Sequence, residues 1–188
     1  MLRGLLCFIA GLCLIAISFS NIYGSDISDP FPSIAKAYLV KENGKILWAH
    51  QPDRRLPPAS LTKIMTALIA LEKLELKEVI TVSRAVSAET GTRIGLKAGD
   101  KLRAGDLVAA SVLQSANDAC RALAEQIGGS QDKFTQTMTL RTKEIALKNT
   151  HFTNACGHDQ SGLYSTANDL AILAETAMKN PVLAKLVS

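Results

Sequence analysis

The chain is poor in aromatic residues, which make up 5% of its 188 residues, and its charges are not segregated. Its 21 lysines and arginines are scattered among 17 aspartates and glutamates, and the net charge is +4. Proteins that bind nucleic acids gather basic side chains on one surface or along one helix. The composition therefore argues against a nucleic-acid partner. The sequence has no internal repeats or low-complexity tracts, and the roughly 164 residues after residue 24 are enough for one core-forming unit.

Cysteine is also scarce, with four in the whole chain. Cys7 and Cys13 lie in an apolar N-terminal run. Cys120 is expected on the apolar side of a helix and Cys156 in a loop. Buried cysteines are commonly free, so we predict two free thiols; a Cys120–Cys156 disulfide in an oxidising compartment is the alternative.

The sequence has no familiar spacing of zinc ligands. His151, Cys156, His158 and Asp159 lie close together in a predicted loop, but their intervals match none of the usual zinc motifs. We interpret them as structural or solvent-facing residues. No metal site is predicted.

Residues 1–24 have the pattern of a signal peptide. Arg3 provides the positive start, and Leu5 to Ile17 form an almost unbroken apolar run. Cleavage is expected after Gly24, with Ser20 as the other small residue at which it could occur. The run is short for a membrane-spanning helix, so an uncleaved anchor is the weaker alternative. The pattern predicts export to the periplasm or to the outer face of the cytoplasmic membrane.

The motif S-x-x-K occurs three times, beginning at Ser33, Ser60 and Ser130. Residues three apart are neighbours on a helix but point to opposite faces of a strand, which argues against Ser33, because its surroundings are strand-like. The motif at Ser130 begins a helix, but no S-x-N triplet follows it. The motif at Ser60 begins an apolar helix and precedes the only S-x-N triplet, Ser115-Ala116-Asn117.

These residue types suit acyl transfer through a serine. Lys63, one helical turn after Ser60, is placed to accept the proton of the serine hydroxyl, provided that burial disfavours the charged amine. Ser115 completes a path for the proton to a leaving amine, and the amide of Asn117 offers a donor and an acceptor to a peptide-like substrate. The pattern predicts a serine acyltransferase.

The remaining pattern predicts helices with a few strands. Asn43-Gly44 between two β-rich runs, 35–40 and 45–50, is a strong hairpin signal. A short strand is expected at 79–82, and turns with short strands at 90–105. Helices are expected at 60–74, 106–114 and 118–126, from Ser130 to about Ile145, and from Thr166 to a stop at Pro181. The chain must break between the second and third helices if residues 115–117 are to face a cleft.

Four segments together resemble the penicillin-binding D-alanyl-D-alanine carboxypeptidases, the serine peptidases that trim the stem peptides of peptidoglycan. The resemblance runs from about residue 34 to residue 184. It implies an α+β fold of the β-lactamase and DD-peptidase type, with a helical cluster beside an antiparallel sheet. The segments are PASLTKIMT at 58–66, QSANDA at 114–119, LKNTHF at 147–152 and YSTA at 164–167.

The resemblance also implies roles and partners. Ser60 would form the acyl-ester, Lys63 would accept its proton, Ser115 would shuttle the proton and Asn117 would bind substrate. The substrate would be a peptidoglycan pentapeptide ending in D-Ala-D-Ala, and β-lactams would acylate the same serine. No metal or organic cofactor is implied. A class A β-lactamase is less well supported, because no Glu-x-x-Leu-Asn sequence is present.

The chain departs from the family at its third motif, since no Lys-Thr-Gly triplet occurs in the sequence. We therefore expect residues 25–188 to be the N-terminal part of a DD-peptidase catalytic domain, with the C-terminal sheet strands missing. A membrane anchor of the usual kind would lie beyond Ser188. The alternative is a short, catalytically impaired product that at most binds peptidoglycan or a partner.

Overall fold

The computed structural model describes residues 28–30, 32 and 34–188. The predicted signal peptide at 1–24 and Ser33 of the first S-x-x-K motif lie outside the described residues. Within the described part, no helix is both long and apolar enough to cross a bilayer. The elements in chain order are β1 (Tyr38–Glu42), β2 (Lys45–His50), the 3-10 turn η1 (Ala59–Leu61), α1 (Thr62–Lys73), β3 (Val79–Thr81), α2 (Arg84–Ser87), β4 (Lys101–Arg103), α3 (Ala104–Leu113), α4 (Asn117–Gly128), α5 (Gln131–Glu144), α6 (Ala167–Ala177) and α7 (Pro181–Leu186).

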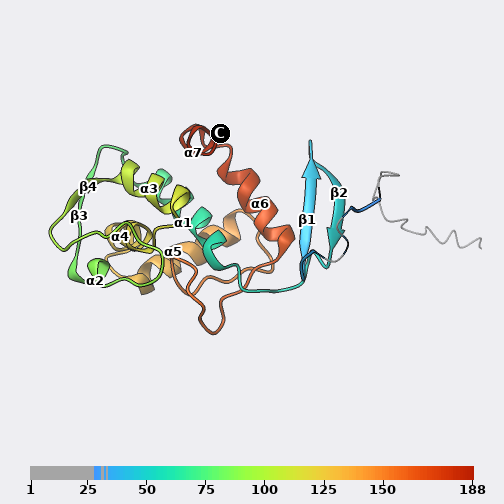
Figure 1. Ribbon diagram of the computed structural model, residues 1–188, viewed down its shortest axis with the longest axis horizontal. Coiled ribbons are helices and arrows are strands. Elements are labelled where there is room, and N and C mark those ends of the chain that lie inside the picture. Colours follow the sequence, from blue (N-terminus) through green and yellow to red (C-terminus); the bar gives the residue numbers. More distant parts are fainter. Residues whose placement is uncertain (1–27, 31, 33) are drawn as a thin grey trace, which may run out of the picture.

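A helical cluster forms the centre of the molecule, and a small antiparallel sheet lies at each end of it (Figure 1). The strands pair as β1 with β2 and as β3 with β4. Helix α1 contacts α3, α4, α5 and α6, so it is the central element of the cluster. The α+β class predicted from the sequence is confirmed.

The predicted hairpin is formed by β1 and β2. Asn43 and Gly44 have φ angles of 50° and 79°, which is the positive region that two-residue hairpin turns require. The first strand begins at Tyr38 rather than at residue 35. An ion pair between Lys41 and Glu175 joins the hairpin to α6.

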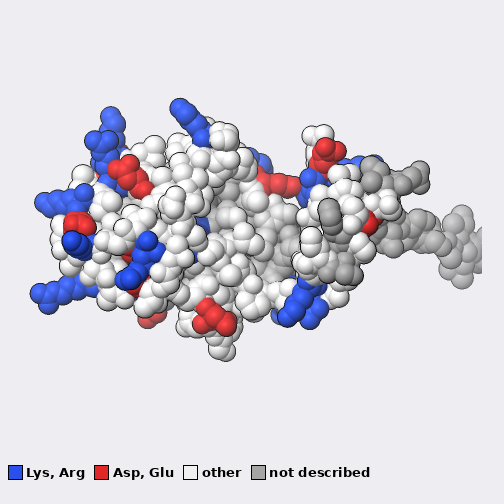
Figure 2. Space-filling view, viewed as in Figure 1, with Lys and Arg blue, Asp and Glu red and all other residues white. Residues whose placement is uncertain are grey.

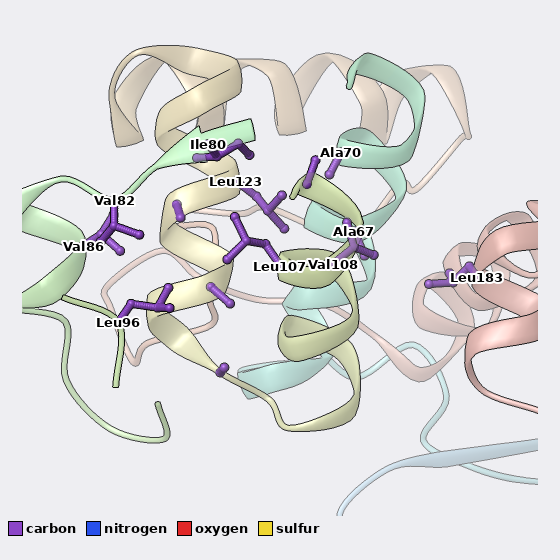
Figure 3. Close-up of a cluster of buried hydrophobic side chains, with 14 of the residues drawn as sticks. Ala67, Ala70, Ile80, Val82, Val86, Leu96, Leu107, Val108, Leu123 and Leu183 are labelled. Atoms are coloured by element: carbon purple, nitrogen blue, oxygen red, sulfur yellow. The ribbon is translucent and has the colours of Figure 1, made fainter. Parts of the chain in front are cut away.

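Two apolar clusters hold α1 in place from different sides. Figure 3 shows the first, in which Ala67 of α1 lies near Leu107 of α3 and Leu123 of α4. In the second, Met65 and Ile69 of α1 belong to a buried group with side chains of α5 and α6 and of the loop between them. Large apolar side chains buried on several sides resist displacement, because moving them opens cavities. Helix α1 is therefore a rigid support for the residues at its N-terminus.

Two predicted helix caps are confirmed. The hydroxyl of Ser130 accepts a hydrogen bond from the backbone N–H of Lys133, and Thr166 does the same for Asp169. Ser130, the serine of the third S-x-x-K motif, therefore has a structural role as a helix cap.

The end of the chain differs from the expected single helix. Helix α6 ends at Ala177, and Pro181 begins a separate helix, α7. The first position of a helix tolerates proline because its N–H would have no partner there. The side chain of Asn180 caps α7 by accepting from the N–H groups of Val182 and Leu183. The short helix α2 was also not expected from the sequence.

Candidate active site

Ser60 lies in the 3-10 turn that leads directly into α1. The residue before it, Ala59, has a φ angle of 47°, which is unusual for a residue with a side chain. One turn later, Lys63 Nζ donates a hydrogen bond to Ser60 Oγ at 3.2 Å. Lys63 is only 3% exposed, whereas Ser60 is exposed to solvent. The structure therefore brings the predicted serine and lysine together and buries the lysine, as the sequence reasoning required.

Ser115 approaches the same hydroxyl from a break in the chain. Helix α3 ends at Leu113 and α4 begins at Asn117, and Ser115 between them has a φ angle of 54°. Its Oγ donates to Ser60 Oγ at 2.9 Å. The hydroxyl oxygen of Ser60 thus faces both the buried amine and a second hydroxyl. The predicted break between the two helices is confirmed.

Asn117 is the first residue of α4 and makes different contacts. Its Nδ2 donates to the carbonyl of Thr90 at 2.7 Å, and its backbone N–H donates to the carbonyl of Thr92 at 2.8 Å. Gly91 lies so close that a Cβ atom there would be 2.7 Å from Nδ2. In this structure, therefore, the described contacts of the Asn117 amide hold the loop around residue 91.

The sequence reasoning did not find Asp118, which fixes the next part of that loop. Its buried carboxylate accepts hydrogen bonds from the backbone N–H groups of Ile94, Gly95 and Leu96, at 3.2, 2.9 and 3.0 Å. It also accepts one from Ala119. The acidic residue in the first turn of the helix was visible in the sequence, but the loop that it binds was not.

The loop at 154–158 is a second element that the sequence reasoning missed. The carbonyl of Cys156 accepts a hydrogen bond from Lys63 Nζ at 2.8 Å. Gly157 has a φ angle of 84°, and a Cβ atom on it would lie 1.9 Å from the carbonyl oxygen of Ala59. The side chain of Asn154 shapes this turn by accepting from the N–H groups of Cys156, Gly157 and His158. The loop thus contacts both the lysine and the residue before the serine.

Ser60, Lys63 and Ser115 border a cavity of about 690 Å³. Part of its wall is apolar and comes from α6, α7 and the residues that follow them, including Ala174, Met178 and Leu183. An open cavity that combines an apolar wall with a few polar groups is the usual form of a small-molecule site.

The residues considered as metal ligands face different partners. His151 Nδ1 contacts the carbonyl of Gly162, whereas His158 Nε2 lies 3.1 Å from Glu89 Oε1. Among the described residues, no group of three or more His, Cys, Asp and Glu side chains forms an arrangement that could hold a metal ion.

Cys120 and Cys156 are buried and free, as predicted. Each thiol donates to a backbone carbonyl, Cys120 to Ala155 and Cys156 to Asn117. The contact with the Cys120 thiol, together with burial, strongly raises the pKa of the Cys156 thiol. The thiol of Cys156 therefore stays protonated and is a poor nucleophile, although it lies beside the site.

Comparison with known proteins identifies the family. The family model of the D-alanyl-D-alanine carboxypeptidases, peptidase family S11, matches residues 28–187. The chain is 33% identical to the D-alanyl-D-alanine carboxypeptidase DacF of Bacillus subtilis over 86% of its length. It is 34% identical to DacC of Escherichia coli over 93% of its length. The chain therefore belongs to the D-alanyl-D-alanine carboxypeptidase family.

Solved structures agree with this assignment. The crystal structure of the D-alanyl-D-alanine carboxypeptidase DacD from Francisella tularensis matches 90% of the chain with a TM-score of 0.79 and 34% identity. A D-alanyl-D-alanine carboxypeptidase from Mycobacterium tuberculosis matches 81% of it with a TM-score of 0.76 and 31% identity. The DD-peptidase fold expected from the resemblance is confirmed.

The matches cover only part of each relative. The chain spans 43% of DacF and 46% of DacC, and 42% and 59% of the two structures.

Proposed function

We propose that this chain carries the nucleophile of a serine-type D-alanyl-D-alanine carboxypeptidase, which removes the terminal D-alanine from peptidoglycan stem peptides. The observation that carries the proposal is the convergence of a buried amine and a second hydroxyl on the exposed Ser60 Oγ. Membership of the family supports the reaction and its substrate. The chain spans less than half of DacF and DacC, so the activity of the whole protein is part of the proposal.

The geometry suggests how the reaction begins. In its unprotonated form, Lys63 accepts the Ser60 proton along their 3.2 Å contact while Ser60 Oγ attacks the carbonyl carbon of the penultimate D-alanine. The C–N bond to the terminal D-alanine then breaks, and its nitrogen receives a proton by way of Ser115. Water later hydrolyses the acyl-ester and regenerates Ser60. Asn117 is proposed to border the substrate.

The partners and location follow from the same proposal. A pentapeptide ending in D-Ala-D-Ala and β-lactam antibiotics would react with the same serine.

Residues 1–24 are proposed to direct export to the periplasm or to the outer face of the cytoplasmic membrane. Expression in a bacterium tests this directly. The chain should be recovered outside the cytoplasm and shortened by about 20 to 24 residues, as mass spectrometry would show, and full-length protein in the cytosol would contradict it.

Labelling with a fluorescent penicillin tests the chemistry. The family resemblance assigns the cation that binds the substrate carboxylate, and a donor of the oxyanion hole, to the Lys-Thr-Gly segment, which this sequence does not contain. Losing one oxyanion donor costs about 100- to 1000-fold in rate. The experiment therefore compares the 188-residue chain with the same chain joined to the C-terminal part of DacF. We expect weak labelling of the first and strong labelling of the second.

Two variants of the extended chain assign the serine. Ser60→Ala should abolish labelling, because it removes the attacking oxygen. Ser130→Ala is the matched control, since it alters the serine of another S-x-x-K motif that serves as a helix cap. Labelling that survives Ser60→Ala would overturn the proposal. If a folded extended chain does not label but binds peptidoglycan, the alternative of a binding module is favoured.

A further inference from the structure

A buried carboxylate outside the Ser60 site connects the two loops that flank it. Glu89 follows α2 and is only 6% exposed. Its Oε1 accepts from the backbone N–H of Thr90 at 3.0 Å, and its Oε2 accepts from Arg121 Nη1 of α4 at 3.0 Å. Oε1 also lies 3.1 Å from Nε2 of His158, which belongs to the loop at 154–158. One side chain therefore contacts the start of the 90–96 loop, helix α4 and the 154–158 loop.

Both of these loops reach the proposed catalytic residues. The carbonyl of Thr90 accepts the hydrogen bond from the Asn117 amide. On the other side, the carbonyl of Cys156, two residues before His158, accepts the hydrogen bond from Lys63. A movement of either loop would change the surroundings of Asn117 or of Lys63.

The contact between Glu89 and His158 depends mainly on charge. His158 Nε2 is buried and makes no hydrogen bond of acceptable geometry within the described residues, although it lies at ion-pair distance from Glu89. The attraction is therefore strongest when the imidazole is protonated, and histidines in general change charge between about pH 5 and 8. The other charged or titratable groups nearby are Arg121 and Glu125 of α4, Arg93 of the 90–96 loop, Lys63 of α1, and Cys156 and Asp159 beside His158.

Arg121 joins Glu89 to helix α4. Arg121 pairs with two carboxylates, Glu89 and Glu125, each at 3.0 Å. Glu125 Oε2 also accepts from the hydroxyl of Ser83, the cap of α2, at 2.6 Å, so the cluster is also joined to the start of α2.

We propose that Glu89 and His158 form a charge clasp that positions the 90–96 loop beside Asn117 and the 154–158 loop beside Lys63. Neither residue touches the reacting atoms; both act through the loops. The effect of the clasp on acylation rests on the proposed function of Ser60. Its effect on the loops does not, so the two can be tested separately.

Hydrogen exchange of the 188-residue chain tests the structural part. In Glu89→Gln, backbone amides of 90–96 and of 154–158 should exchange about tenfold faster than in the unmodified chain. The matched control is Glu72→Gln. It removes the ion pair between Glu72 of α1 and Arg141, whose charged atoms are 2.7 Å apart and which lies outside these loops. Exchange at 154–158 that is the same in Glu89→Gln as in the control would overturn the clasp.

A pair of variants at His158 tests whether charge is the cause. At pH 8, where a lysine keeps its charge and most histidines do not, His158→Lys should protect residues 154–158 better than His158→Gln. Equal exchange in the two variants would contradict the proposal.

Acylation by fluorescent penicillin tests the consequence for catalysis, in the chain extended with the DacF segment. Glu89→Gln should lower the maximal acylation rate about fivefold, because Lys63 is displaced, and any change in the half-saturating penicillin concentration would reflect the 90–96 loop beside Asn117. An unchanged maximal rate would refute a positioning role. If no protein labels, not even the unmodified extended chain, the proposed function of Ser60 is contradicted. The hydrogen-exchange data would then still test whether Glu89 and His158 hold the two loops.

Discussion

Lys63 and Cys156 are 93 positions apart in the sequence, yet Lys63 Nζ donates a hydrogen bond to the Cys156 carbonyl at 2.8 Å. This contact leaves the amine with two oxygen partners, that carbonyl and the hydroxyl of Ser60. Mutation of the Cys156 side chain leaves the backbone carbonyl of this residue in place. The position of the amine therefore depends on the path of the 154–158 loop rather than on the cysteine thiol.

Replacement of Lys63 by alanine should slow acylation of Ser60 by at least about 100-fold, the typical contribution of a positioned base. The measurement is the rate of labelling with fluorescent penicillin in the extended chain. Lys73→Ala is the matched control, because Lys73 lies at the other end of the same helix. Equal rates in the two variants would show that Lys63 does not serve as the base.

Gly157→Ala should destabilise the fold by about 3 kcal/mol or more, because the added Cβ would lie 1.9 Å from the carbonyl oxygen of Ala59 and a backbone atom cannot easily move away. Gly99→Ala is the control. Gly99 also has a positive φ, 92°, but it has open space around it, so only the backbone penalty of about 1 to 2 kcal/mol is expected. Urea-induced unfolding measures both, and a smaller loss at Gly157 than at Gly99 would contradict the close packing of the loop.

Asp118→Asn should cost about 2 to 3 kcal/mol of unfolding free energy, since the carboxylate accepts from the backbone N–H groups of residues 94–96 and an amide NH₂ cannot. Asp100→Asn provides the comparison, because the exposed Asp100 carboxylate accepts a single such bond, from Lys97. The same unfolding experiment applies. A loss at Asp118 no larger than that at Asp100 would mean that the loop is held by other contacts.

Glu89 should make the free energy of unfolding depend on pH. Burial raises the pKa of its carboxyl, but hydrogen bonds from Thr90 and Arg121 and the nearby His158 outweigh this effect and hold the pKa below the usual 4.5. Folding thus favours the charged form. The stabilisation from this group is complete above pH 4.5 and is lost as the pH falls through the lower value of the folded state.

The measurement is the free energy of unfolding between about pH 6 and pH 3. The difference between the unmodified chain and Glu89→Gln should shrink as the pH falls. Glu144→Gln, at a mostly exposed carboxylate, serves as the control for the loss of one negative charge. A difference for Glu89→Gln that stays constant over this range would contradict the lowered pKa.

Local signals in the sequence foretold much of the fold. The Asn-Gly turn predicted the hairpin, and Ser130 and Thr166 marked the starts of α5 and α6, because these signals act through hydrogen bonds or backbone angles within a few residues. The helix from Thr166 does end before Pro181, but the sequence reasoning did not expect the new helix that Pro181 begins, although proline is suited to the first turn of a helix.

The serine and the lysine of the candidate site could be paired from the sequence alone, because a spacing of three on a helix fixes their proximity. The S-x-N triplet could be assigned to the same site only as an expectation. Ser115 is 55 positions from Ser60, and the contact between their hydroxyls depends on how α3 and α4 pack against α1. The contacts of Asp118, Gly157 and Glu89 with distant segments were decided by the tertiary structure alone. Such contacts are set by the packing of the whole core and leave no periodic or local pattern in the chain.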